Sequence, residues 1–235
     1  MRKYKESLAD FDESIKLGLN DGRVYLNRGV ALDGLGRHAE AIKDYGTSIK
    51  LEPGNATAYF NRGESFAREG QDDAAIADYS RAVGIEPQFA SAYWNRATLF
   101  LKKHNYAAAI SDYSLVEKLE PENGHVYGCL AALYATCPEA NFRNGAVAIE
   151  YATKANKLGD MPQHLTLAAL AAANAESGHF DQAVEWQTKS IQSAPESDRM
   201  ALKVRLNLYK WGKPFHGDFF DLGTQPSESQ HSEKK

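Results

Sequence analysis

The chain has 235 residues, of which 25% are charged, and its formal net charge at pH 7 is −4. This mildly acidic balance argues against the basic stripe on which nucleic-acid binding depends. The apolar runs are short and interrupted by charge, so no segment is expected to span a membrane. The N-terminal stretch MRKYKESLADF lacks the apolar core of a signal peptide.

A frame of 34 residues recurs along the chain. Two tyrosine phases, one asparagine phase and one proline phase repeat without slippage, which is the signature of a repeat array with one continuous core. The residues in these phases are Tyr25, Tyr59, Tyr93 and Tyr127; Tyr45, Tyr79 and Tyr113; Asn27, Asn61 and Asn95; and Pro53, Pro87 and Pro121.

Each unit predicts a helix, a short turn and a second helix. With Ala56 as position one, small or apolar residues at four, seven, eight and eleven share one helical face, and those at twenty, twenty-four and twenty-seven share another. A breaker stands between them at position fifteen, and the proline at thirty-two ends the second helix. The breakers are Gly36, Gly70 and His104.

This pattern resembles the tetratricopeptide repeat (TPR) family from Tyr4 to about Pro195. The small residue of that family at eight is Gly29, Gly63 and Ala97, its alanine at twenty is Ala41, Ala75 and Ala109, and its small residue at twenty-seven is Ser48 and Ala82, with Val116 as a departure. The resemblance implies an all-α, right-handed α-α superhelix, a TPR solenoid of about five repeats with an N-terminal half repeat and a C-terminal capping helix.

In chain order, residues 4–21 match only the second helix of a repeat. They are either a cap or the edge of a fragment of a longer array, and the packing needs of Leu8, Phe11 and Ile15 favour the fragment. Regular repeats are predicted at 22–55, 56–89 and 90–123.

The later repeats depart from this spacing. A lengthened repeat is expected at 124–163, where Pro138 to Gly145 inserts about five residues, as in a bacterial TPR variant with a long penultimate turn. A regular repeat follows at 164–197, then a capping helix at 198–212 and a disordered tail at 221–235. Ser197 or Asp198 is expected to cap the last helix, and its face of Met200, Val204, Leu208 and Trp211 to cover the last repeat.

The two cysteines, Cys129 and Cys137, lie eight residues apart on one predicted helix. A rise of 1.5 Å per residue separates them by about 12 Å, beyond the roughly 7 Å that a disulfide allows between Cα atoms. We therefore expect thiols in a reducing compartment, and a cytoplasmic protein.

In three repeats an arginine at position seven accompanies an aspartate at position twenty-three. Both are replaced in the later repeats, by Leu130 with Tyr151 and by Leu170 with Trp186. Because position seven faces the second helix, its charge needs a partner there. We predict structural ion pairs of Arg28 with Asp44, Arg62 with Asp78, and Arg96 with Asp112. Asp10 holds position twenty-three of the half repeat, which also favours a fragment.

Positions two, five, six, nine, twelve and thirteen of the first helix lie opposite its core face and form the concave wall of a stacked array. An asparagine at position six offers a donor and an acceptor, as a peptide group does. Some TPR superhelices hold an extended chain with such asparagines, and the resemblance implies the same for Asn27, Asn61 and Asn95. The alternative is that these amides tie down the neighbouring repeat or are solvated.

Four further side chains are predicted to bind the peptide. Phe60 and Trp94 stand at position five of adjacent repeats, as exposed aromatic anchors or as packing between repeats. Arg68 and Lys102, at position thirteen, can meet acidic groups or a terminal carboxylate. The carboxylate clamp of the chaperone-binding TPR type is not reproduced in two successive repeats.

No arrangement that carries chemistry stands out in the sequence. The histidines are scattered and none has metal-ligand spacing, and no serine sits in a nucleophile elbow. The pair Gly34 and Gly36 follows no strand, so it is not a phosphate loop. We predict no catalytic residue, no metal and no cofactor.

The sequence therefore predicts a scaffold that binds an extended peptide of a protein partner between Asn27 and Lys102. A second hypothesis is an assembly module that self-associates through the N-terminal helix. A third, from family analogy alone, is an accessory segment of a larger multidomain protein.

Overall fold

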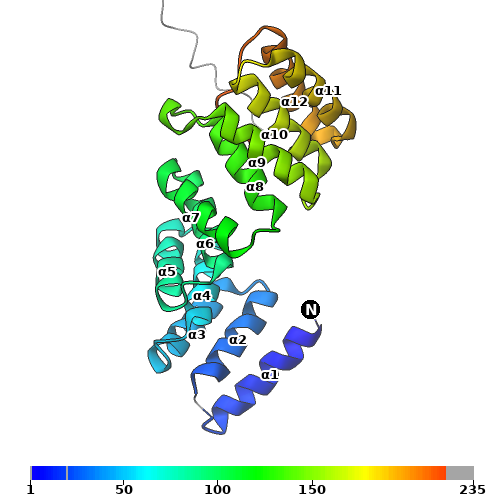
Figure 1. The fold of residues 1–235 in the computed structure, drawn as a ribbon. Coiled ribbons are helices and arrows are strands. Elements are labelled where there is room, and N and C mark those ends of the chain that lie inside the picture. The colour runs from blue at the N-terminus through cyan, green and yellow to red at the C-terminus, as the bar shows by residue number, and fades with distance from the viewer. Residues whose placement is uncertain (1, 20, 221–235) are drawn as a thin grey trace, which may run out of the picture. The chain divides into compact units, whose positions relative to one another are not determined.

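The computed structural model describes residues 2–19 and 21–220. The predicted disordered tail, residues 221–235, lies outside them. The described residues form α-helices, one 3-10 turn and no strand, and they divide after Leu119 into two compact units (Figure 1). None of the described helices combines the length and the apolar character that crossing a membrane requires.

The first unit holds seven helices, and consecutive helices pack against each other from α1 to α7. The contact of α2 with α4 shows that first helices of successive repeats also meet. The helices are α1 (Arg2–Lys16), α2 (Gly22–Gly34), α3 (His38–Leu51), α4 (Ala56–Arg68), α5 (Asp72–Ile85), α6 (Ala90–Lys102) and α7 (Tyr106–Leu119).

Side-chain caps and left-handed turns set the bounds of these helices. Asp21 accepts a hydrogen bond from the Val24 amide at 2.9 Å, and Asn55 accepts one from the Ala58 amide at 3.2 Å, so each satisfies an amide that the first turn leaves unpaired. The breaker at position fifteen takes a positive φ, +76° at Gly36 and +72° at Gly70, which ends the first helix.

The tyrosine at position twenty-four explains the small residue at position eight. A Cβ added at Gly29 would lie 2.6 Å from a ring atom of Tyr45, and one at Gly63 would lie 2.8 Å from Tyr79. Both tyrosine rings are at most 2% exposed. The second helix thus approaches the first closely enough to bury a whole aromatic ring against the backbone.

The second unit has helices of the same kind, with a core made largely of alanine. Between its first two helices, the predicted insertion from Pro138 to Gly145 contains a 3-10 turn, and Arg143 fastens it to the carbonyl of Cys137 at 2.8 Å and to Glu176 at 3.0 Å. The elements are α8 (Gly124–Thr136), η1 (Ala140–Phe142), α9 (Gly145–Leu158), α10 (Gln163–Glu176), α11 (Phe180–Ser193) and α12 (Glu196–Lys210).

Helix α12 corrects two sequence predictions. It begins at Glu196 after Pro195, so neither Ser197 nor Asp198 caps it. Its apolar face was expected to cover the last repeat, but Met200 and Trp211 are each 71% exposed and Val204 is 40% exposed.

The buried face of α12 consists of Leu202, Arg205 and Tyr209. Gly212, fifteen positions into the frame, has φ of +67°, close to the +79° of Gly178 one repeat earlier. α12 therefore ends as a first helix does. The sequence prediction chose the most apolar face of the helix. That choice was wrong because the buried face has Arg205 at its centre.

Candidate functional site

The seven residues predicted to bind peptide all lie on α2, α4 and α6, the first helices of the first unit. Asn27 on α2 is exposed, whereas Asn61 on α4 and Asn95 on α6 are half-buried. We call the surface made by positions two, five, six, nine, twelve and thirteen of these three helices the first-unit wall.

Asn95 already has partners within the protein. Its amide lies close enough to the side chains of Glu64 and Tyr79, in the preceding helix pair, to lower the pKa of both against the effect of burial. Desolvation by burial raises the pKa of Glu64, with the Asp33 carboxylate adding to the effect, while Arg68 and the Asn95 hydrogen bond oppose it. Asn95 therefore lies against the preceding repeat, as the alternative reading of the asparagines expects.

The aromatic residues at position five are packed rather than fully exposed. The Phe60 ring lies 4.7 Å from that of Phe89 and 5.8 Å from that of Tyr79. The Trp94 ring meets Tyr113 edge-on at 5.2 Å. Both Phe60 and Trp94 are half-buried, so the expectation of exposed anchors is wrong, although part of each ring remains accessible.

The two cations at position thirteen differ from each other. Lys102 on α6 forms an ion pair with Asp72 on α5 at 2.7 Å, so this lysine also joins successive repeats. Its side chain is nonetheless 61% exposed. Arg68 is exposed, and its charge lowers the pKa of Glu64 against the effect of burial.

A polar network around Asp33 escaped the sequence analysis. One carboxylate oxygen accepts hydrogen bonds from the Tyr45 hydroxyl at 2.9 Å and the Ser65 hydroxyl at 2.7 Å, and the other lies 2.8 Å from His38 Nδ1. Burial, together with this carboxylate, raises the pKa of Tyr45. Because Ser65 belongs to α4, the network joins α2 and α3 to the next repeat. Asp33 is the only acidic residue at position twelve among the repeats, so comparison of the repeats does not predict this network.

Each of the three arginine–aspartate pairs is a bidentate ion pair within one repeat. The two hydrogen bonds from Arg28 to Asp44 are both 2.7 Å long. Those from Arg62 to Asp78 are 2.7 and 2.8 Å long, and so are those from Arg96 to Asp112. The aspartate side chains are only 5–8% exposed. Two parallel bonds to one carboxylate are the geometry in which a guanidinium binds best.

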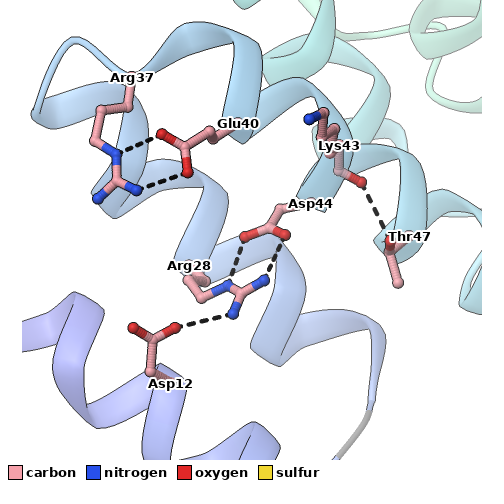
Figure 2. A network of polar contacts seen from close by, with 7 residues as sticks. All are labelled: Asp12, Arg28, Arg37, Glu40, Lys43, Asp44 and Thr47. Atoms are coloured by element: carbon pink, nitrogen blue, oxygen red, sulfur yellow. Dashed lines mark hydrogen bonds and ion pairs between the residues drawn. The ribbon is translucent and has the colours of Figure 1, made fainter.

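Each arginine also points toward the preceding repeat. Figure 2 shows Arg28 between Asp44 on α3 and Asp12 on α1, with its third nitrogen 2.9 Å from Asp12. The same nitrogen of Arg96 donates to the Ser80 hydroxyl at 2.9 Å. Asp12 and Ser80 hold position twenty-five, where the intervening repeat has Gly46. Comparison of the repeats at that position could have revealed this second contact.

An open pocket of about 220 Å³ lies over Arg28. Its charges are largely paired within the protein, because Arg37 forms an ion pair with Glu40 at 2.6 Å and Arg28 is held by two aspartates (Figure 2). It is lined by Leu8, Asp12, Arg28, Leu32, Arg37, Glu40, Lys43 and Asp44.

In the second unit, aromatic rings replace the ion pairs. Tyr151, at position twenty-three, stacks on Tyr127 at 5.8 Å and on Tyr134 at 5.9 Å. Lys154 lies 4.0 Å from the centre of the Tyr127 ring. Both cysteines are buried, Cys129 within α8 and Cys137 immediately after it. In the part of the chain that the structure describes, no group of three or more potential ligands is placed to hold a metal ion.

Comparison with known proteins agrees with this architecture. Residues 1–50 and 26–88 match the family model described as tetratricopeptide repeat. No curated protein matches the chain by sequence.

Solved structures share the fold. The TPR protein YrrB, described as having an unusual peptide-binding site, superposes with a TM-score of 0.67 at 17% identity, over 79% of this chain and 93% of its own. MamA from Desulfovibrio magneticus RS-1 gives 0.64 at 19% identity, over 73% and 94%. A thermophilic TPR protein from Thermus thermophilus gives 0.51 at 19% identity, over 81% and 99%. The predicted all-α TPR fold is confirmed.

Proposed function

We propose that this chain is a tetratricopeptide repeat protein that acts as a protein-interaction scaffold and binds an extended peptide segment of a partner along the first-unit wall. The observation that carries the proposal is the set of three amides, Asn27, Asn61 and Asn95, at the same position of successive first helices. One amide per repeat matches the regular spacing of peptide groups in an extended segment.

The amides differ in how much of their hydrogen-bonding capacity is available. Asn27 is exposed and Asn61 half-buried, while Asn95 shares its amide with Glu64 and Tyr79. A primary amide has two donors and an acceptor with two lone pairs, so Asn95 keeps capacity for a guest. Its protein partners fix its orientation, which lowers the entropy lost when a peptide binds.

The remaining wall residues supply affinity rather than register. The accessible parts of Phe60 and Trp94 offer apolar surface that is already held in place by neighbouring rings. Arg68 and Lys102 stand at the exposed edge, where cations steer an acidic peptide toward the wall more than they tighten the complex. The similarity in fold to YrrB, a protein with a peptide-binding site, supports this assignment.

Selection from a random peptide library tests the proposal. The wild-type chain should enrich peptides that the double variant Asn61→Ala/Trp94→Ala binds at least tenfold more weakly. Asn156→Ala, at an exposed asparagine of α9, is the matched control and should leave binding unchanged. If no peptide is enriched, or if the enriched peptides bind the double variant equally well, the first-unit wall is not the site.

Self-association is a second candidate, favoured by the exposed apolar residues of α12. Met200 and Trp211 are each 71% exposed, and α12 has the phase of a first helix. Helix α1 has the phase of a second helix, its Tyr4 is 41% exposed, and Leu17, directly after the helix, is 72% exposed. We infer that α12 of one copy pairs with α1 of another, a head-to-tail contact that propagates unless it closes into a ring.

Light scattering over a range of concentrations tests whether the chain self-associates. Trp211→Asp should convert an associating wild-type chain into a monomer, while Lys213→Asp, at a neighbouring exposed position, should not. A wild-type chain that is monomeric at every concentration excludes self-association and leaves the peptide-binding proposal untouched.

A further inference from the structure

The residues that follow α12 fold back over the second unit. We call residues 213–220 the C-terminal strap. It runs from the end of α12 toward the end of α8, as the orange segment of Figure 1 shows, and the Gly217 amide donates to the Thr136 carbonyl at 2.8 Å. Thr136 is the last residue of α8, where carbonyls lack a partner within the helix. The strap therefore takes up a hydrogen-bonding site that the helix end leaves open.

A second polar contact holds the strap at the end of α10. His216 Nε2 lies 2.7 Å from the Glu176 carboxylate. The same carboxylate group binds Arg143 at 3.0 Å through its other oxygen. The strap is thus tied to the carboxyl ends of two successive first helices.

The third first helix, α12, meets the strap through a buried arginine. Arg205 is 2% exposed, and it donates to the Phe219 carbonyl at 2.6 Å and to the Asp218 carbonyl at 3.4 Å. Its guanidinium also lies 4.4 Å from the centre of the Phe215 ring and 4.9 Å from that of Phe219. A buried charge needs such partners, and here main-chain carbonyls and aromatic faces of the strap supply them.

Phe219 fills a recess lined with small side chains. It is 3% exposed and belongs to a core cluster with alanines of α8 and α10 and with Leu202 of α12. Five residues of this cluster hold positions five, nine and twelve of the repeat frame, which are among the positions that form the first-unit wall. These five residues are Ala132, Ala135, Ala168, Ala172 and Leu202.

We propose that the wall of α8, α10 and α12 is a second peptide-binding site, which the C-terminal strap occupies within the same chain. The site takes an extended segment with a phenylalanine for the alanine-lined recess and two main-chain carbonyls for Arg205. This assignment is independent of the first-unit wall, because every contact that carries it lies in the second unit.

The way the strap is attached fits a segment that can leave. It contains no helix, and it is held by the Gly217 amide, the His216 contact, the Arg205 contacts and two rings. Segments with few backbone bonds open at lower free energy than the helices beneath them. A covalently linked strap acts at an effective concentration of roughly millimolar, so it keeps weaker free peptides out while closed.

Amide hydrogen exchange on the wild-type chain tests whether the strap opens alone. The Gly217 amide should exchange at least tenfold faster than the Tyr209 amide in the middle of the last turn of α12, because opening of the strap leaves α12 folded. If Gly217 and Tyr209 exchange at the same rate, through unfolding of the whole unit, the strap is a fixed part of the core and the proposal is wrong.

Binding of the strap as a free peptide tests the site itself. A fluorescent peptide of residues 213–220 should bind full-length Phe219→Ala at least tenfold more tightly than it binds the wild-type chain, whose site is occupied. Phe220→Ala is the matched control, since Phe220 is 39% exposed, and it should behave as wild type. The same peptide with alanine in place of Phe219 should not bind any of these chains.

Gly217→Pro provides a second route if Phe219→Ala does not fold. It removes the amide that bonds to Thr136 and places a Cβ 2.9 Å from the Phe215 ring, and both changes loosen the strap. Phe219 is kept, so no cavity opens in the core. Circular dichroism establishes that each variant is folded. A folded variant with a loosened strap that fails to bind the free peptide overturns the proposal.

Discussion

At the scale of single residues, two of the three arginines at position seven join three helices rather than two. Arg28 bonds to Asp44 in its own repeat and to Asp12 in the preceding helix, and Arg96 bonds to Asp112 and to Ser80. The guanidinium suits this place because its five donors fan out in one plane. Arg28 and Arg96 therefore act both within a repeat and between repeats.

The Arg62–Asp78 pair is the cleanest one to measure, because Gly46 offers Arg62 no second partner. Asp78→Asn should lower the free energy of unfolding by about 3 kcal/mol, since it leaves a half-buried guanidinium without its carboxylate. The same substitution in an Arg62→Leu background should cost less by about 1 kcal/mol or more, by a double-mutant cycle in urea. Equal costs in the two backgrounds would contradict a paired role.

Gly46 offers a stabilising substitution. A Cβ there meets only the Arg62 guanidinium, at 3.7 Å, so Gly46→Ala should gain about 0.5–1 kcal/mol from helix propensity. Gly46→Ser should gain a further amount of about 0.5–1.5 kcal/mol, if its hydroxyl accepts from Arg62 as Ser80 accepts from Arg96.

Gly84 is the control for this series, because a Cβ there has open space around it. Gly84→Ala should match Gly46→Ala, whereas Gly84→Ser should show no extra gain over Gly84→Ala. Urea denaturation of the four variants measures both differences. An equal serine effect at the two positions would show that the contact with Arg62 is not formed.

Glu64 makes stability depend on pH. Burial raises its pKa above the ordinary 4.5, so ionisation is less favourable in the folded chain than in the unfolded one. The resulting penalty is absent below the unfolded pKa and complete above the raised folded pKa. Glu64→Gln should therefore raise the urea midpoint at pH 7, and the gain should disappear as the pH falls below 4.5.

Glu40→Gln is the control of opposite sign. The hydrogen bonds from Arg37 lower the pKa of Glu40, so its charged form is the favoured one in the folded chain. This substitution should not raise the urea midpoint at pH 7. A gain for Glu64→Gln that persists unchanged at about pH 4, below the ordinary glutamate pKa, would contradict the assigned cause.

At the scale of elements, the turn at position fifteen is the most regular feature of the chain. Glycines occupy it with φ between +67° and +79° in four repeats, at Gly36, Gly70, Gly178 and Gly212. His104 holds the same position with φ of +56°. A residue with a Cβ in the left-handed region costs about 1–2 kcal/mol. The strain in this turn therefore comes from the side chain of His104, because glycine adopts the same turn in four other repeats.

His104→Gly should raise the free energy of unfolding by about 0.5–1 kcal/mol, because glycine adopts the left-handed region without a steric penalty. The gain is reduced by loss of the contact between His104 Nδ1 and the Tyr106 hydroxyl at 3.1 Å. Thermal denaturation of this variant and of Gly70→Ala measures the expected gain in stability and the expected loss. Gly70→Ala should destabilise by a similar amount, and a destabilised His104→Gly would contradict the strain argument.

The elements themselves could largely be read from the sequence, because the same caps, breakers and prolines recur in register. The exceptions arose where a repeat broke its own pattern. The buried face of α12 was not predicted because it contains Arg205, and a sequence pattern treats arginine as an exposed residue. The strap has no periodicity, although Phe215, Phe219 and Phe220 within an otherwise polar segment were a usable signal.

At the scale of the whole molecule, the chain offers two walls in different states. The first-unit wall carries the asparagines, and the wall of the second unit carries alanines and holds the strap. The sequence located the asparagines but not their partners, because contacts such as Asn95 with Glu64 and Ser65 with Asp33 join residues that do not repeat. Only the three-dimensional structure shows which wall residues are already engaged.

Side-chain amide resonances give the most direct test of peptide binding on the first-unit wall. In a ¹⁵N-labelled chain titrated with a peptide from the library selection, the NH2 signals of Asn27, Asn61 and Asn95 should shift together, with one shared dissociation constant. The NH2 signal of Asn174, which is 5% exposed within the second unit, should stay in place. Saturation by the peptide without movement of the three asparagine signals would contradict the account.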